Sequence, residues 1–250
     1  MANAYTNDEL VFLTRLTERA GRYAEMRSYV TSLVQQGYNL DASERQLFSV
    51  AHRECISVHR NTWRTLHTLL KSEKNAETIA YSRTLISSAE SSIKSISRDI
   101  LGLLSKYLLP TCANPESKVY YLKLEGDYKR YMAEISSGKE HAEWSEECHN
   151  SYKSAADLAL SCLKPVDPTR LGLFMNFSVF YYDVYNSPER ACILAKAACD
   201  EAIDGGLEYA AQNVEKEGEH IYAGSAEIVR LMQNNLSKWA ARLVASAKKE

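Results

Sequence analysis

Hydrophobic residues recur every three or four positions along most of the chain, which is the period of an amphipathic α-helix. Gly21, Gly37 and Pro110 interrupt this pattern, whereas residues 38–101 contain neither glycine nor proline. Because these two residue types end helices, the sequence predicts an all-α protein with nine helices and no strand. The predicted helices span about 4–20, 22–36, 41–72, 75–109, 116–137, 141–164, 168–185, 188–204 and 225–247.

The helices are predicted to form a single domain, residues 1–250, with a turn in its middle. Pro110 and Pro115 mark this turn and separate four helices in residues 1–110 from five in residues 111–250. Asp41 followed by Glu44 predicts a capping box at the start of the third helix. Residues 205–224 combine glycines with mixed charge, and the sequence predicts an unusually long connection there before the last helix.

The overall composition excludes several classes of function. The 30 basic and 32 acidic side chains give a net charge of −2, which excludes a strongly basic protein that coats nucleic acid. The chain has no apolar run long enough to cross a membrane and no leader pattern, so we expect a cytoplasmic protein without membrane insertion. The six cysteines form no CxxC pair and are predicted to be free thiols.

Enzyme signatures are absent, because the chain has no glycine-rich phosphate loop, no GxSxG and no HExxH. Two clusters leave chemical interpretations open. His52, Cys55 and His59 fit either a cysteine nucleophile with its base or packing at the edge of the core. Potential zinc ligands also gather on the predicted helix 141–164, where a solvated helix face is the other interpretation. These ligands are His141, Glu143, Glu147, Cys148 and His149.

Two predicted helices carry polar residues on one face. Arg53, Arg60 and Arg64 form a basic stripe on the third helix. Such a stripe is often only a solvated face, but paired arginines with a tyrosine hydroxyl also suit a dianionic phosphate. A carboxylate on the second face could hold an arginine in place by a charge-assisted bond. That second face contains Lys123, Asp127, Arg130 and Tyr131.

Two further helices carry apolar stripes, each interrupted by one amide. These stripes fit either a core with satisfied amides or the apolar wall of a groove whose other wall is basic. The first stripe consists of Met175, Asn176, Val179 and Asp183. The second consists of Ile228, Leu231, Asn235 and Trp239.

Two long segments resemble the 14-3-3 family of adaptor proteins that bind phosphoserine and phosphothreonine. These are SKVYYLKLEGDYKRYMAE at 117–134 and RLGLFMNFSVFYYDVYNSPE at 170–189, with shorter similarities at 45–51, 63–64 and 200–203. The resemblance extends over nearly the whole chain. It implies nine antiparallel helices in a cup-shaped, usually dimeric protomer with a concave amphipathic groove, without catalytic activity, metal or cofactor.

The resemblance also assigns individual residues. The positions that match the family's phosphate ligands are Arg53, Arg60, Arg130 and Tyr131. The positions that match its peptide groove are Lys123, Asn176, Val179, Asp183, Ile228, Leu231, Asn235, Lys238 and Trp239. Three of these depart from the usual pattern: Arg53 replaces a lysine, Asp183 a glutamate and Lys238 an apolar residue. We expect Lys238 to shift the preference for the residue that follows the phosphorylated one.

The resemblance implies a homodimer whose pairing is weakened or altered. The residues that match the family's dimer interface are Leu13, Leu16, Ala20, Arg22, Glu25 and Leu85. Arg22 and Glu25 match positions that form salt bridges across this interface, but Ser88 and Ser92 stand where their partners are expected. Leu85 stands where a tyrosine is usual. Because exposed ion pairs contribute only about 0–1 kcal/mol, we expect apolar packing to hold the dimer.

The predicted function is therefore a phosphoserine- and phosphothreonine-dependent adaptor in signalling. It would bind phosphorylated segments of its partners and regulate these partners by masking, clamping or bridging them. The alternative is a helical scaffold whose altered or vestigial groove binds unphosphorylated partners.

Overall fold

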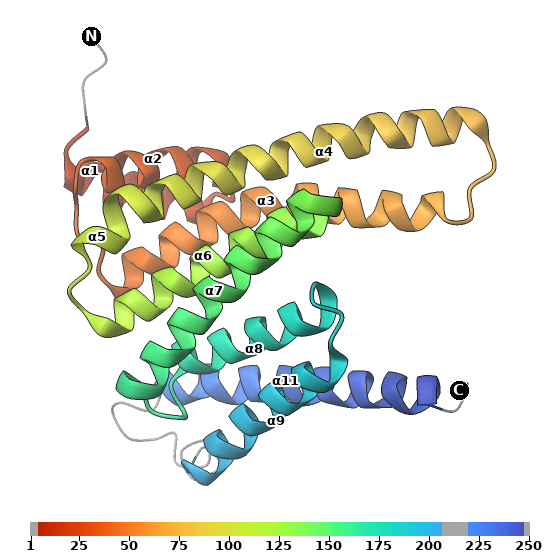
Figure 1. Ribbon diagram of the computed structural model, residues 1–250. Coiled ribbons are helices and arrows are strands. Elements are labelled where there is room, and N and C mark those ends of the chain that lie inside the picture. The colour runs from red at the N-terminus through yellow and green to blue at the C-terminus, as the bar shows by residue number, and fades with distance from the viewer. Residues whose placement is uncertain (1–4, 207–219, 248–250) are drawn as a thin grey trace. The chain divides into compact units, whose positions relative to one another are not determined.

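The computed structural model describes residues 5–206 and 220–247, which form helices joined by turns (Figure 1). The all-α prediction is confirmed, because these residues contain nine helices longer than ten residues and no strand. The chain divides into two compact units, Met1–Cys112 and Ala113–Glu250. Their boundary lies close to the division that Pro110 and Pro115 predict.

The first unit contains two antiparallel helix pairs (Figure 1). The short pair consists of α1 (Asn7–Arg19) and α2 (Tyr23–Gln35), and the long pair of α3 (Ala42–Leu70) and α4 (Ala76–Leu103). Met26, Phe48, Ile93 and Ile100 are fully buried and form part of the core between α2, α3 and α4. Each of these helices therefore buries one apolar face, as the periodicity of its apolar residues indicates.

The ends of the first helices follow local chemistry. Asp41 Oδ1 accepts a 2.7 Å hydrogen bond from the Glu44 backbone N–H, and Glu44 Oε2 accepts a 2.9 Å bond from the Asp41 backbone N–H. The capping box predicted at this position is confirmed. Gly21 and Gly37 follow α1 and α2 with φ of 66° and 77°, a left-handed conformation that glycine adopts at little cost.

The predicted helix 75–109 loses its regular α-helical form before Pro110. α4 ends at Leu103, the next residues form a π-helical turn (η1, Leu104–Leu108), and a short α5 follows (Leu109–Thr111). Pro110 has no backbone N–H to donate, and in a regular helix its ring would collide with the carbonyl of Lys106. The wider turn accommodates the proline without ending the helical path.

The second unit contains the remaining long helices. These are α6 (Pro115–Ile135), α7 (Gly138–Cys162), α8 (Pro168–Asp183), α9 (Pro188–Asp204) and α11 (His220–Ala247). Three of them begin at a proline, since the first helical position needs no N–H. The sequence predicts this for Pro168 and Pro188, whereas α6 begins at Pro115, one residue before its predicted start. Tyr152, Phe177 and Phe180 are buried at the centre of this unit's core.

Three predicted helix starts are wrong. The first helix is predicted from about 4, but α1 begins at Asn7, after Thr6 as its N-cap. The sequence predicts a start at about 141, but α7 begins at Gly138. The φ of Gly138 is 57°, so the chain turns at the first residue of the helix. The last helix begins at His220, inside the connection predicted at 205–224. Residues 207–219 of that predicted connection lie outside the described residues.

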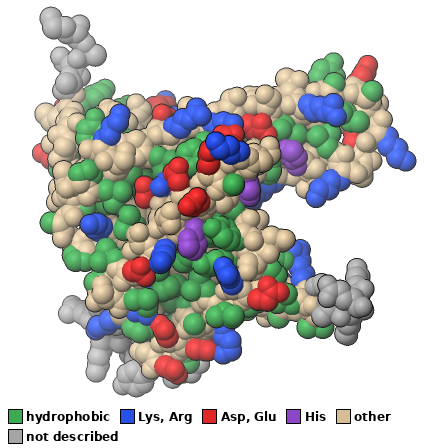
Figure 2. Space-filling model, viewed as in Figure 1, with side chains coloured by type: hydrophobic (Ala, Val, Ile, Leu, Met, Phe, Trp, Pro, Cys, Tyr) green, Lys and Arg blue, Asp and Glu red, His purple; other side chains and the backbone are tan. Residues whose placement is uncertain are grey.

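The surface of each unit carries both signs of charge, and Figure 2 shows lysine and arginine side chains interspersed with acidic ones. Among the described residues, no helix is both long and apolar enough to cross a membrane.

Candidate functional site

A buried carboxylate joins three helices of the second unit. Asp127 on α6 is 4% exposed. Its Oδ2 accepts a 2.8 Å hydrogen bond from Lys123 Nζ, and its Oδ1 accepts bonds of 2.5 Å from the Tyr152 hydroxyl and 2.7 Å from Asn176 Nδ2. Tyr152 lies on α7 and Asn176 on α8. Three donors from three helices therefore fix this carboxylate and the side chains around it.

Arg130 is connected to this carboxylate through Tyr152. Its Nε donates a 3.3 Å hydrogen bond to the Tyr152 hydroxyl, and its guanidinium carbon lies 4.9 Å from the centre of the Tyr131 ring. The sequence predicts a direct bond between Asp127 and an arginine, whereas Tyr152 stands between Arg130 and the carboxylate. We call Lys123, Asp127, Arg130, Tyr152 and Asn176 the α6–α8 network.

The α6–α8 network remains ionised at neutral pH. Burial alone would raise the pKa of Asp127, but the charges of Lys123 and Arg130 and the hydrogen bonds from Lys123 and Tyr152 together outweigh burial and lower that pKa. Burial would likewise lower the pKa of Lys123, and the Asp127 carboxylate outweighs it and raises the pKa. The network thus holds two cations and one anion. This excess of positive charge in a largely buried setting favours an anionic ligand.

Gly126 allows α6 and α7 to approach closely at the network. A methyl group at this position would lie 2.6 Å from Cδ1 of Tyr152, closer than carbon atoms can pack. The Cys148 thiol also donates a 3.2 Å hydrogen bond to the Gly126 carbonyl oxygen. The glycine therefore sets the position of the Tyr152 ring relative to Asp127 and Arg130.

Tyr152 is held by an aromatic cluster on α8. Its ring stacks on Phe177 at 5.3 Å between centroids and lies 5.8 Å from Phe180. Tyr152 has no distinguishing signal in the sequence, because a tyrosine on an amphipathic helix looks like any other core residue. Only the packing of α7 against α6 shows that its hydroxyl belongs to the polar network.

The first unit supplies the other predicted phosphate ligands from α3. Arg60 is half-buried and Arg53 is exposed. Arg53 Nε lies 3.1 Å from Glu54 Oε1 and forms an ion pair with it. An exposed pair of this kind contributes about 0–1 kcal/mol, so Glu54 restrains Arg53 only weakly. Glu54 was not singled out from the sequence.

The predicted groove residues on α8 and α11 divide into buried and exposed sets. Trp239 is 6% exposed, stacks on Tyr182 at 4.9 Å between ring centroids, and packs with Val179 between α8, α9 and α11. The half-buried groove residues are Asn176, Ile228 and Asn235. The exposed ones are Asp183, Leu231 and Lys238. Trp239 thus anchors α11 in the core, whereas the side chains of the second set lie at the surface.

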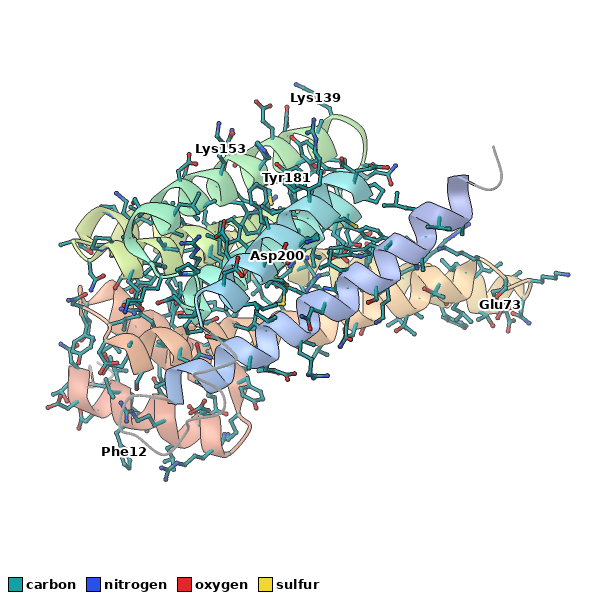
Figure 3. All side chains as sticks on the ribbon, turned by 90° about the horizontal axis from the view of Figure 1, so that it is seen from below. Phe12, Glu73, Lys139, Lys153, Tyr181 and Asp200 are labelled. Atoms are coloured by element: carbon teal, nitrogen blue, oxygen red, sulfur yellow. The ribbon has the colours of Figure 1, made fainter. Side chains whose placement is uncertain are left out.

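The predicted dimer residues include exposed apolar side chains. Leu16 and Leu85 are 50% and 54% exposed, and Ala20 is also exposed, whereas Leu13 is half-buried. Phe12, which the sequence analysis did not identify, is 65% exposed and extends away from α1 (Figure 3). Large exposed apolar side chains are typical of interaction surfaces when they gather in one patch.

Arg22 and Glu25, the charged residues predicted at the dimer interface, form an ion pair within the protomer. Arg22 Nη2 lies 2.5 Å from Glu25 Oε1. The two residues can therefore compensate each other's charge without a partner from a second chain.

The interpretation of residues 141–149 as a metal site is wrong. His141 Nδ1 lies 2.8 Å from the Ala133 carbonyl oxygen, Cys148 is buried, and His149 Nε2 lies 3.2 Å from the Tyr181 hydroxyl. These side chains turn towards different neighbours. Within residues 5–206 and 220–247, no three His, Cys, Asp or Glu side chains form a group that could hold a metal ion.

His52, Cys55 and His59, the cluster on α3, do not provide an activated cysteine. Burial raises the pKa of the Cys55 thiol, whereas a nucleophilic cysteine needs a lowered pKa. His52 is fully buried, and its Nδ1 lies 2.8 Å from the Phe48 carbonyl oxygen. The position of His52 fits the other interpretation, in which its side chain packs in the core.

The fold and the α6–α8 network define an all-helical protein with a buried, hydrogen-bonded cluster of two cations and one carboxylate in its second unit. The family model described as 14-3-3 protein matches residues 13–240. The chain is 39% identical over 232 residues to 14-3-3 protein beta/alpha of Xenopus tropicalis, covering 92% of both chains. It is 39% identical to 14-3-3-like protein A of Glycine max, covering 94% of this chain and 90% of that protein. Protein BMH2 of Saccharomyces cerevisiae is 37% identical, with 98% and 88% covered.

The chain therefore belongs to the 14-3-3 family. Proteins of this family are adaptors rather than enzymes. Membership of this family supports a general role for the chain in binding phosphoproteins.

Proposed function

We propose that this protein binds partner segments phosphorylated on serine or threonine and regulates these partners by masking, clamping or bridging them. The α6–α8 network carries the proposal, because it holds Arg130 and Lys123 in place around a carboxylate that three donors satisfy. A site whose cations are already oriented loses little side-chain entropy when it binds an anion.

A phosphate group supplies the charge that this site favours. A phosphoserine carries about −1.5 to −2 charges and three acceptor oxygens. The family resemblance assigns the binding of this phosphate to Arg53, Arg60, Arg130 and Tyr131. Each charge-assisted hydrogen bond contributes roughly 1.5–3 kcal/mol. An unmodified serine has no charge and offers one hydroxyl oxygen in place of three charged acceptors, so binding depends on phosphorylation.

The backbone of the partner segment is assigned to the two amides. Asn176 donates one N–H to Asp127, which fixes the orientation of its side-chain amide. An amide has a second N–H and an oxygen acceptor, and both suit an extended peptide backbone. Asn235 is assigned the same role from α11. The remaining groove residues are Lys123, Val179, Asp183, Ile228, Leu231, Lys238 and Trp239.

The protein is further proposed to form a cytoplasmic homodimer through Leu13, Leu16, Ala20, Leu85 and the neighbouring surface of the first unit. The exposed side chains of Leu16 and Leu85 support this proposal. Two grooves in one dimer would bind a doubly phosphorylated partner with avidity. Light scattering after size-exclusion chromatography should give twice the mass of one chain, and Leu16→Glu should reduce it to that of a monomer.

Fluorescence anisotropy tests the proposed function directly. A labelled peptide of the Arg-x-x-pSer-x-Pro type should bind the full-length protein, and the unphosphorylated peptide should not. Arg60→Ala should weaken binding at least tenfold, because one charge-assisted interaction is lost. Arg64→Ala removes an arginine from the same helix and serves as the matched control.

Equal binding of the two peptides, unaffected by Arg60→Ala, would overturn the proposal. That result would support the alternative scaffold, whose groove binds unphosphorylated partners.

A further inference from the structure

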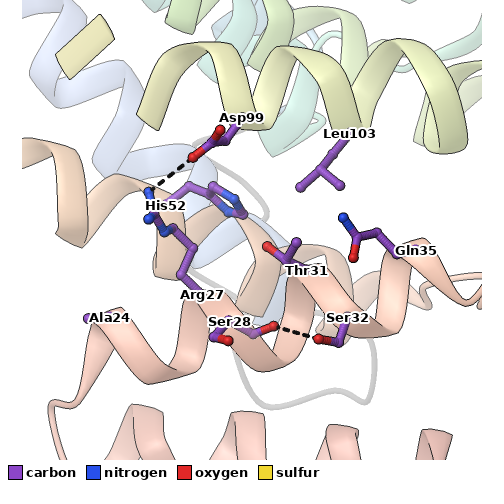
Figure 4. Close-up of a pocket in the computed structure, with 9 residues that line it drawn as sticks. All are labelled: Ala24, Arg27, Ser28, Thr31, Ser32, Gln35, His52, Asp99 and Leu103. Atoms are coloured by element: carbon purple, nitrogen blue, oxygen red, sulfur yellow. Dashed lines mark hydrogen bonds and ion pairs between the residues drawn. The ribbon is translucent and has the colours of Figure 1, made fainter. Parts of the chain in front are cut away.

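A cavity of about 380 Å³ lies in the first unit and contains none of the residues assigned to phosphate binding. It lies between α2, α3 and α4 (Figure 4). One face of α2 lines it with side chains between Ala24 and Gln35, while α3 contributes His52 and α4 contributes Asp99. The volume falls within the lower part of the range for small-molecule sites.

His52 brings a hydrogen-bond acceptor to this cavity. Its side chain is 0% exposed, and its Nδ1 lies 2.8 Å from the Phe48 carbonyl oxygen. A carbonyl oxygen only accepts, so Nδ1 carries the proton and Nε2 carries the lone pair. Burial lowers the pKa of His52 to about 4, which keeps the ring neutral. Nε2 is buried and has no hydrogen-bond partner among the residues that the structure describes.

Arg27 brings a donor to the same cavity. Its Nη1 is buried and makes no hydrogen bond with any described residue. The nearest carboxylate oxygen, Asp99 Oδ2, lies 3.9 Å away, too far for a hydrogen bond but close enough for attraction between the charges. Buried donors and acceptors in proteins nearly always have partners. A ligand that satisfies both Arg27 and His52 would therefore bind favourably.

The lining selects a neutral ligand with hydroxyl groups. A hydroxyl can accept from Arg27 and donate to His52 through the same oxygen. The charges of Arg27 and Asp99 cancel and His52 is neutral, so an anion would gain little attraction and would face a carboxylate. The hydroxyls of Ser28 and Thr31 can donate and accept in turn, as a ligand with several hydroxyls requires.

We propose that the cavity between α2, α3 and α4 binds a small neutral polyol or sugar. This ligand places one hydroxyl between Arg27 Nη1 and His52 Nε2. The site is separate from the proposed phosphate ligands, so it stands or falls independently of phosphopeptide binding. Occupation of the cavity stabilises the folded first unit, because the ligand binds only when the three helices are assembled.

NMR spectroscopy of the full-length protein with ¹⁵N-labelled histidine provides the test. The chain has six histidines, and His52→Phe identifies the His52 signals by their loss. Glycerol, myo-inositol and glucose are titrated separately, with inorganic phosphate as the anionic probe. We expect a saturable shift of the His52 Nε2 signal with at least one of the three neutral compounds and none with phosphate.

Arg27→Met tests the donor while keeping much of the apolar stem. It should weaken polyol binding roughly tenfold or more, because a charge-assisted bond is lost. Arg19→Met, which changes an exposed arginine on α1, should leave the affinity unchanged. A saturable NMR shift is the required readout, since polyols also stabilise proteins without binding to a site.

Three results would overturn the proposal. The first is the absence of a saturable His52 shift up to molar polyol, which would mean that the cavity holds only water. The second is a saturable shift with phosphate instead of the neutral compounds. The third is equal affinity of wild type and Arg27→Met.

Discussion

The Tyr152 hydroxyl donates a 2.5 Å hydrogen bond to Asp127 Oδ1 across 25 residues of sequence. The same hydroxyl accepts from Nε of Arg130. One oxygen on α7 therefore couples the buried carboxylate of α6 to the arginine assigned to phosphate. The orientation of Arg130 consequently depends on a residue that has no charge of its own.

Tyr152→Phe should weaken phosphopeptide binding about tenfold, because Arg130 loses an acceptor that orients it. Asp127 loses one of its three donors at the same time, so the free energy of unfolding should fall by about 1–2 kcal/mol. Anisotropy and urea denaturation measure the two effects. Tyr81→Phe, at a side chain that is 71% exposed, is the control. Unchanged affinity in Tyr152→Phe would show that this hydroxyl does not position Arg130.

Gly126→Ala should destabilise the protein by about 1–3 kcal/mol, because the added methyl group overlaps the Tyr152 ring. Displacement of that ring should also reduce phosphopeptide affinity. Gly102→Ala is the matched control, since a methyl group at Gly102 in α4 meets nothing within 4 Å. This control should be neutral or stabilising by up to about 1 kcal/mol, as alanine favours helices. Thermal and urea denaturation distinguish the two, and equal effects would contradict the prediction.

Glu54→Gln should strengthen phosphopeptide binding up to about threefold, because it removes the carboxylate paired with Arg53. The effect should be largest at low ionic strength and fade as salt screens exposed charges. Glu143→Gln removes an equal charge from an exposed pair with Lys139 and tests for an effect of net charge alone. An increase of the same size in both variants would mean that Glu54 does not restrain Arg53.

The stability of the protein should fall between about pH 6.5 and pH 4 through His52. The unfolded histidine has a pKa of about 6.5, while burial, assisted by the charge of Arg27, lowers the folded value to about 4. Because the unfolded chain binds this proton first as pH falls, the contribution of neutral His52 is complete above pH 6.5. It is lost progressively towards pH 4 and amounts to at most about 3 kcal/mol.

Urea denaturation across this pH range measures that loss. His52→Phe should flatten the dependence on pH, whereas His67→Phe, at an exposed histidine of the same helix, should leave it unchanged. Identical slopes in wild type and His52→Phe would contradict the lowered pKa of His52.

The sequence predicted the helices well because their signals are local. The capping box at Asp41 and Glu44 acts within four residues, and the prolines that begin α6, α8 and α9 act within one turn. The errors also have local causes. Gly138 begins α7 with a left-handed φ instead of separating two helices, and Pro110 widens its helix instead of simply ending it.

The sequence by itself determined the fold class and the family resemblance, since helix spacing and motif identity are written along the chain. It also supplied Arg60, Arg130 and Lys123 as proposed ligands. Only the tertiary structure decided that Tyr152 connects Arg130 to Asp127, and that Arg27 and His52 share a cavity. The physical reason is that a buried hydrogen bond depends on how helices distant in sequence pack together. Residue spacing within one helix carries no information about that distance.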